Sequence, residues 1–376
     1  MHSTPMHCSS PAPGAGRLAF LDWMRGLAAL IMLQGHVFHS FTAAPLREQS
    51  AYVLSQFIGG ITPAVFLFLT GVTLAFLMDS RTRQGVPPRR RVWTAMRRAG
   101  FLALAAVAFR LQLWIFAAGQ SAWEHLFKVD ILNCMALAIL ALSPLAALGT
   151  LERVRWAGGI GVGVAVLAPV ATASDWSWLH PFVRHYFVPS YDFFSFFPWA
   201  AFVAFGVAAG SVLRLTKADQ MHRLMQWSTL LGLGLIFTAQ YFSNLPYTLY
   251  SKAEFWLNSP GLIFIKTGAL LLMASGAFLW TRYLAPDGWS PLRQLGSTSL
   301  LVYWVHTELV YGRWFGAYKE SLPTPAVLAL AGFIIVLMVA LSVARTGWKG
   351  QPALMDRMRR WMGRGLEPAP QPASGD

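Results

Sequence analysis

Charged residues are scarce in this sequence, at 12% of 376 residues, and acids are scarcest, with 16 Asp and Glu against 30 Lys and Arg. A water-soluble domain of this length needs more charge on its surface. The chain is instead 55% hydrophobic, with a mean hydropathy of +0.47, and apolar runs of membrane-spanning length recur along it. The sequence therefore predicts an all-α polytopic membrane protein and excludes a soluble enzyme.

Cysteine is also nearly absent, and Cys8 and Cys134 offer neither a disulfide framework nor a zinc spacing. Residues 1–16 lack the basic start and apolar core of a cleaved signal peptide, so we expect a disordered tail followed by an uncleaved first helix. The net charge of +14 does not indicate nucleic acid as a partner, because the basic residues lie in short segments between apolar runs, where they act as topology signals.

Apolar runs of about twenty residues predict ten membrane spans within a transmembrane domain at 17–345, followed by a basic tail at 346–376 that ends in a Pro-rich segment. The predicted spans are 18–42, 53–78, 93–118, 129–148, 157–173, 194–213, 226–243, 261–280, 295–314 and 323–344. The sequence Thr62-Pro63 predicts a kink in the second span, and Pro198 opens the sixth.

The arginine-rich segment 80–98, between spans two and three, predicts the orientation, because basic loops stay in the cytoplasm. Propagated through ten spans, this places 21 Lys and Arg on the cytoplasmic side and six on the outer side, and the other three of the 30, which are Arg25, Arg110 and Lys266, inside spans. Both termini are then expected in the cytoplasm. A bacterial inner membrane is favoured, because the outer loops are short and carry no glycosylation sequon.

Two outer loops, 174–195 and 244–260, are rich in Trp, Tyr and Phe. They fit an aromatic belt at the membrane interface, or a platform on which a sugar packs. His180 and His185 in the first loop are five residues apart with no third ligand, so no metal site is predicted there.

The stretch 17–41 is a membrane-length helix with a polar stripe. Asp22, Arg25 and His36 share one face with Ala29 and Met32, because their spacings of three and four residues follow the helical period. Arg25 and His36 are eleven residues apart, or about 16 Å along the helix. Charged groups in a span usually face a bundle interior or a water-filled cavity, so we expect this helix to form the wall of a site.

Further polar residues lie in the outer halves of other spans. Arg110 lies in the third span, Asp130 and Asn133 open the fourth, and His306 and Glu308 lie in the ninth. Structural roles remain open for each. Asp22 and Arg25 could form a local ion pair, Asp130 could cap its helix, and a buried histidine could join two helices.

The first helix, in which Leu21-Asp22 is followed by Arg25-Gly26-Leu27 and closes at His36, resembles that of the integral-membrane acyltransferases. Arg25 and His36 match the Arg, ten residues, His spacing of the acyltransferase-3 group. Segments 61–76, 129–139, 196–206 and 295–306 are similar to helices of the heparan-alpha-glucosaminide N-acetyltransferase branch. Within that branch the lysosomal enzyme has a different residue at the position of His36, so heparan is not implied as the substrate.

This resemblance implies an enzyme that moves an acyl group, most simply acetyl, from cytoplasmic acetyl-CoA or another acyl-CoA to a carbohydrate or lipid-linked glycan at the outer face, with no metal. His36 would be the general base, Asp130 or Glu308 could orient it, and Asn133 could donate a hydrogen bond to the oxyanion. His306 is a further candidate for the catalytic site. Donor phosphates would meet cationic residues. The candidates for donor binding are Asp22, Arg25, Arg97, Arg98 and Arg110.

A transporter or flippase for a glycan or lipid is the alternative, because the same polar stripe could line a translocation path. Secondary transporters often contain internal repeats. The two halves of this chain show no clear repeat, which favours the transferase.

Overall fold

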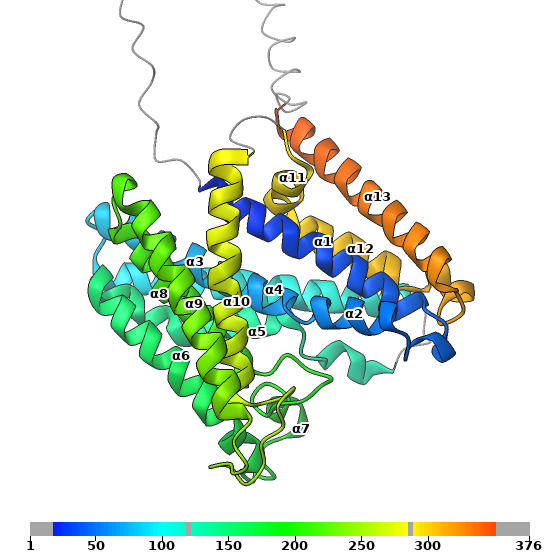
Figure 1. The fold of residues 1–376 in the computed structure, drawn as a ribbon, viewed down its shortest axis with the longest axis horizontal. Coiled ribbons are helices and arrows are strands. Elements are labelled where there is room, and N and C mark those ends of the chain that lie inside the picture. Colours follow the sequence, from blue (N-terminus) through cyan, green and yellow to red (C-terminus); the bar gives the residue numbers. More distant parts are fainter. Residues whose placement is uncertain (1–17, 118–121, 285–288, 351–376) are drawn as a thin grey trace, which may run out of the picture.

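A computed structural model describes residues 18–117, 122–284 and 289–350, with the side chains of the last helix described up to residue 347. Those residues form helices and no named strand (Figure 1). The helices of the first half are α1 (Ala19–Phe41), α2 (Ser50–Gly59), α3 (Thr62–Arg83), α4 (Pro88–Phe116), α5 (Ile131–Leu142), α6 (Thr150–Ala173) and α7 (Pro181–Arg184). Those of the second half are α8 (Phe196–Leu215), α9 (Met221–Ser243), α10 (Pro260–Leu279), α11 (Pro291–Ser297), α12 (Ser299–Tyr311) and α13 (Thr324–Gly350).

The all-α prediction is confirmed for the described residues, and seven of their helical segments are long and apolar enough to cross a membrane. α1, α9 and the pair α11–α12 are not among the seven. α1 falls outside because its polar stripe lowers its hydropathy. The tail predicted at 1–16 lies outside the described residues, as does 351–376, and α13 continues past the predicted domain end at 345.

The second predicted span is broken where the sequence predicted a kink. α2 ends at Gly59 and α3 begins at Thr62, with Pro63 in its first turn. Proline is tolerated there because its missing N–H would have no partner within the helix. The same discontinuity recurs between α11 and α12, at Thr298.

α1 lies at the centre of the bundle. It contacts α2, α3, α10, α11, α12 and α13, and it runs beside α12 in Figure 1. Its two faces enter separate apolar clusters. Met24 and Ala28 pack with α3, α5 and α8, whereas Leu33 and Val37 pack with α12 and α13. The predicted wall helix is therefore surrounded by protein.

α3 and α8 approach closely through glycines. A Cβ atom at Gly71 would lie 2.0 Å from the Val203 carbonyl oxygen, and one at Gly206 would lie 2.0 Å from that of Phe68. Small residues of this kind let helices in a membrane pack backbone to backbone.

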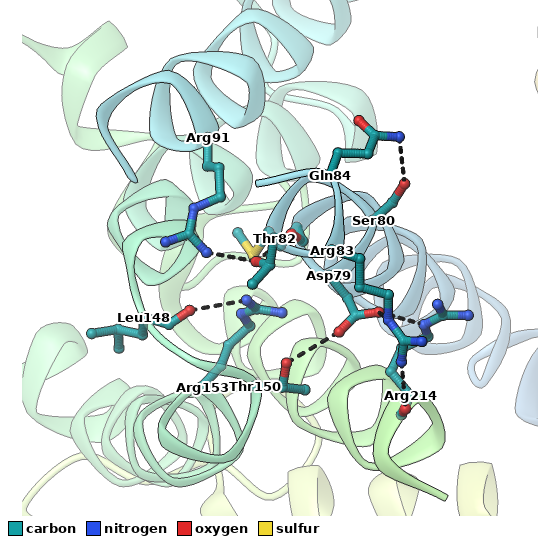
Figure 2. Close-up of polar contacts among 11 residues, drawn as sticks. Asp79, Ser80, Thr82, Arg83, Gln84, Arg91, Leu148, Thr150, Arg153 and Arg214 are labelled. Atoms are coloured by element: carbon teal, nitrogen blue, oxygen red, sulfur yellow. Dashed lines mark hydrogen bonds and ion pairs between the residues drawn. The ribbon is translucent and has the colours of Figure 1, made fainter. Parts of the chain in front are cut away.

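A polar cluster around Asp79 joins the ends of α3, α4, α6 and α8 (Figure 2). Arg214 and Arg83 donate from Nε to Asp79 Oδ2 at 2.7 and 2.8 Å, and the Thr150 hydroxyl donates to Oδ1 at 3.1 Å. Arg91 and Arg153 donate to the carbonyls of Ala147 and Leu148, just after α5. These contacts bring the C-terminal ends of α3 and α8 together with the N-terminal ends of α4 and α6.

We expect Asp79→Leu to destabilise the protein by about 3 kcal/mol, because it leaves two guanidinium groups without their buried carboxylate. The side chain of Asp79 is 5% exposed. Asp219→Leu, at an exposed acid, is the control. Thermal unfolding in detergent measures the difference, and equal transition temperatures for the two variants would show that the cluster contributes nothing to stability.

Candidate functional site

A cavity of about 890 Å³ lies against the polar stripe of α1. Both Arg25 and His36 line it, together with residues from α2, α3, α4, α5, α8, α10 and α12. Thr73, Arg98 and Ser299 lie on its wall, as do Gln56, Gly60, Tyr191 and Tyr311. A volume of this size is typical of small-molecule and cofactor sites.

His36 is paired with His306 on α12, which is 270 residues away in the sequence. Nδ1 of His36 lies 2.9 Å from Nε2 of His306, and the two rings stack with centroids 5.2 Å apart. His306 is fully buried behind His36 and does not line the cavity. The structure thus brings together two of the histidines that the sequence singled out.

A backbone carbonyl determines which ring nitrogens carry protons in the neutral pair. Nδ1 of His306 lies 2.7 Å from the Val302 carbonyl oxygen, which can only accept, so this nitrogen bears the proton. Nε2 of His306 is then an acceptor, and His36 must donate to it from Nδ1. Nε2 of His36 is left with its lone pair and has no hydrogen-bond partner among the described residues.

Among the described residues that line the cavity, three are cationic, namely Arg25, Arg98 and Lys266, and none is an acid. Arg25 is near Asp22 of the same helix, with Nη1 3.3 Å from Oδ1, as the alternative of a local ion pair predicted. Arg98 donates to the Thr73 hydroxyl at 3.1 Å. The cavity wall therefore has a positive charge, which suits an anionic ligand.

One comparison with known proteins decides the family. Residues 17–246 match the model of the heparan-alpha-glucosaminide N-acetyltransferase catalytic domain. The chain belongs to this family. No curated protein sequence matches the chain. Membership indicates an acetyltransferase-type membrane enzyme that acts on glycans, with acetyl-CoA as the family's donor. The match covers α1 to α9, whereas His306 and Lys266 lie beyond it.

Asp130 and Asn133 do not line the cavity. Asp130 caps α5, because Oδ1 accepts from the backbone N–H groups of Leu132 and Asn133, and Arg110 donates to its Oδ2 at 3.0 Å. The amide of Asn133 donates to Asp130 and accepts from the Tyr186 hydroxyl. The predicted helix cap is present, and Arg110 is paired with the cap instead of facing the cavity.

Glu308 and Arg97 also lie outside the cavity lining. Oε1 of Glu308 accepts from the Trp314 indole at 3.0 Å, while Oε2 is buried with no partner among the described residues. Arg97 is exposed, whereas its neighbour Arg98 lines the cavity. Consecutive residues on a helix point in different directions, so only one of these two arginines faces the cavity.

The aromatic loop 174–195 contributes to one end of the cavity. Tyr191 and Phe194 line it, and the Tyr191 hydroxyl donates to Glu254 Oε2 at 3.0 Å. This hydrogen bond raises the pKa of Tyr191. His180 and His185 lie elsewhere in the loop, where His180 caps α7 and His185 stacks on Phe193.

Sequence reasoning placed Lys266 inside a span but not in the site. It lines the cavity, with Nζ 5.2 Å from the centre of the Trp199 ring. The signal was present in the sequence, since a single lysine interrupts the apolar run of α10. Such a residue is by default a functional candidate.

Proposed function

We propose that this protein transfers an acetyl group from cytoplasmic acetyl-CoA to a hydroxyl or amine of a carbohydrate acceptor at the outer face of the membrane. One observation carries the proposal: a single cavity connects two arginines, Arg25 and Arg98, with the His36–His306 pair. The same cavity can therefore hold an anionic donor and place it beside a general base.

The proposed orientation has ten spans and both termini in the cytoplasm. It is supported by the Asp79 cluster, which gathers basic residues from four helix ends that share one end of the bundle. Basic residues concentrate on the cytoplasmic side of membrane proteins. The Arg25 end of the cavity would then face the cytoplasm and the His36 end the outer side. We favour a bacterial inner membrane.

Arg25 and Arg98 would hold the phosphates of the donor. Guanidinium groups form charge-assisted hydrogen bonds with phosphate oxygens. The pantetheine arm would run along the cavity toward His36, about 16 Å from Arg25 along α1. In this proposal, the spacing of Arg25 and His36 sets the distance between the residue that holds the donor phosphates and the residue beside the reacting carbonyl.

The acyl transfer would be carried out at Nε2 of His36. This nitrogen takes the proton of the acceptor O–H or N–H as the acceptor atom attacks the thioester carbonyl. A bond from that atom to the acetyl carbon forms, and the carbon–sulfur bond breaks. The sulfur leaves with the proton from His36, which yields acetylated acceptor and free CoA.

Thr62 is our candidate donor to the oxyanion. It is the first residue of α3, it lines the cavity, and its buried hydroxyl has no partner among the described residues. The helix N-terminus favours the negative charge that develops on the carbonyl oxygen. Thr62 replaces Asn133 in this role, because the amide of Asn133 is already hydrogen-bonded on both sides.

Purified protein incubated with radiolabelled acetyl-CoA and a panel of amino sugars and glycan oligosaccharides tests the function. We expect label in the sugar fraction. A protein that binds glycans but leaves acetyl-CoA intact would belong to the transport class instead.

His306 is a positioning residue for His36, and its replacement separates this role from packing. We expect His306→Leu to lower kcat roughly tenfold to a hundredfold, because His36 loses the acceptor that orients its Nδ1–H. His306→Gln should recover part of the loss, since its amide oxygen can accept the same proton. The measurement is kcat for acetyl transfer by both variants. Equal losses of kcat would show that His306 contributes only packing.

A further inference from the structure

No acidic partner of Lys266 is found in the part of the chain that the structure describes. Its ammonium group lies over the Trp199 ring, and no hydrogen bond or ion pair of Lys266 is found among the described residues. No Asp or Glu is found among the described residues that line its cavity. A cation within a spanning segment is costly and usually pairs with an acid. A cation–π contact offsets only part of that cost.

Lys266 lies near the His36 end of the cavity. It follows the start of α10 at Pro260 by six residues, or about 9 Å, and His36 precedes the end of α1 at Phe41 by five, or about 8 Å. These two helix ends lie at one end of the bundle. Trp256, just before α10, contacts Phe57 of α2, whose Gly59 packs on Gly35 of α1.

The two arginines lie much further from that end. Arg25 precedes the end of α1 by 16 residues, or about 24 Å, and Arg98 precedes the end of α4 at Phe116 by 18, or about 27 Å. The ends of α1 and α4 both lie near the end of α12, since Ser40 donates to the Val310 carbonyl and Phe116 contacts Trp314, three residues after α12. The two arginines and Lys266 are therefore at different levels of the cavity.

We propose that Lys266, supported by Trp199, binds an acidic group of the acceptor. The acceptor would then be a carbohydrate with a carboxylate, phosphate or sulfate near the group that is acetylated. This inference rests on the proposed function. Tyr191 and Phe194 line the same cavity and supply ring surfaces against which a sugar can pack.

The test compares a neutral acceptor with acidic analogues of the same sugar. Glucosamine, glucosamine 6-phosphate, glucosamine 6-sulfate and glucosaminuronic acid are the probes. We expect wild-type protein to use at least one acidic probe with a kcat/KM about tenfold or more above that of glucosamine. The preferred probe identifies the acidic group.

Two variants assign that preference to the charge of Lys266. Lys266→Met keeps the length of the side chain and removes its charge, so we expect it to lower kcat/KM for the acidic probe to the level of glucosamine, a much larger loss than the one for glucosamine itself. Lys266→Arg should retain the preference. An equal loss of kcat/KM for neutral and acidic probes would overturn the inference. Weakened acetyl-CoA binding in Lys266→Met would also overturn it, because Lys266 would then contact the donor and not the acceptor.

A binding measurement separates failure of this inference from failure of the proposed function. We expect the acidic probe to raise the unfolding temperature of wild-type protein but not of Lys266→Met, whether or not acetyl transfer occurs. Transfer without any acidic preference would overturn the inference and leave the function standing. Binding of the acidic probe without acetyl transfer would overturn the proposed function and leave the binding role of Lys266 standing.

Discussion

His36→Ala should lower kcat for acetyl transfer by roughly 10²–10⁴-fold, the range that a positioned general base contributes. The unprotonated Nε2 of His36 is the reason, because the hydrogen bond to His306 leaves this nitrogen free to take a proton. We expect the affinity for acetyl-CoA to change little, since the donor phosphates are proposed to bind near Arg25 and Arg98, away from His36.

Steady-state kinetics with saturating acetyl-CoA measure the effect. His222→Ala is the matched control, because His222 is exposed at the start of α9 and does not line the cavity. If His36→Ala kept the wild-type rate, the base would have to be sought elsewhere.

Arg98→Ala should weaken acetyl-CoA binding roughly tenfold to a hundredfold, because each charge-assisted hydrogen bond to phosphate contributes about 1.5–3 kcal/mol. Arg98 lines the cavity, and its hydrogen bond to the Thr73 hydroxyl leaves other N–H groups of its guanidinium for a ligand.

The neighbouring residue provides the control. Arg97→Ala removes the same charge from the same helix turn, but Arg97 is exposed and outside the cavity. Isothermal titration with acetyl-CoA should find Arg97→Ala close to wild type. Equal losses in the two variants would mean that net charge, and not the cavity, attracts the donor.

Most of the fold could be predicted because apolar runs of spanning length have few alternatives to helix. The break before Thr62 was predictable from Pro63, which cannot donate within a helix. The Asp79 cluster was not predicted, because its members come from four helices whose packing the sequence does not specify.

The site was predicted in part. A stripe on α1 could be read from helical spacing, which is a local property. The face that α12 turns toward α1 depends on packing between segments far apart in the sequence. The sequence therefore did not show that His306 pairs with His36. Asp130 and Arg110 were selected for their charge and depth, but charges in a membrane often pair with each other, as these two do.

Sealed proteoliposomes with acetyl-CoA on one side only test the central claim most directly. With radiolabelled acetyl-CoA on the side of the Arg25 end and acceptor sugar on the other, we expect labelled sugar to accumulate on the acceptor side while CoA stays with the donor. Labelling only when both substrates share one side would contradict transfer through the cavity. Movement of unlabelled sugar across the bilayer would identify a transporter.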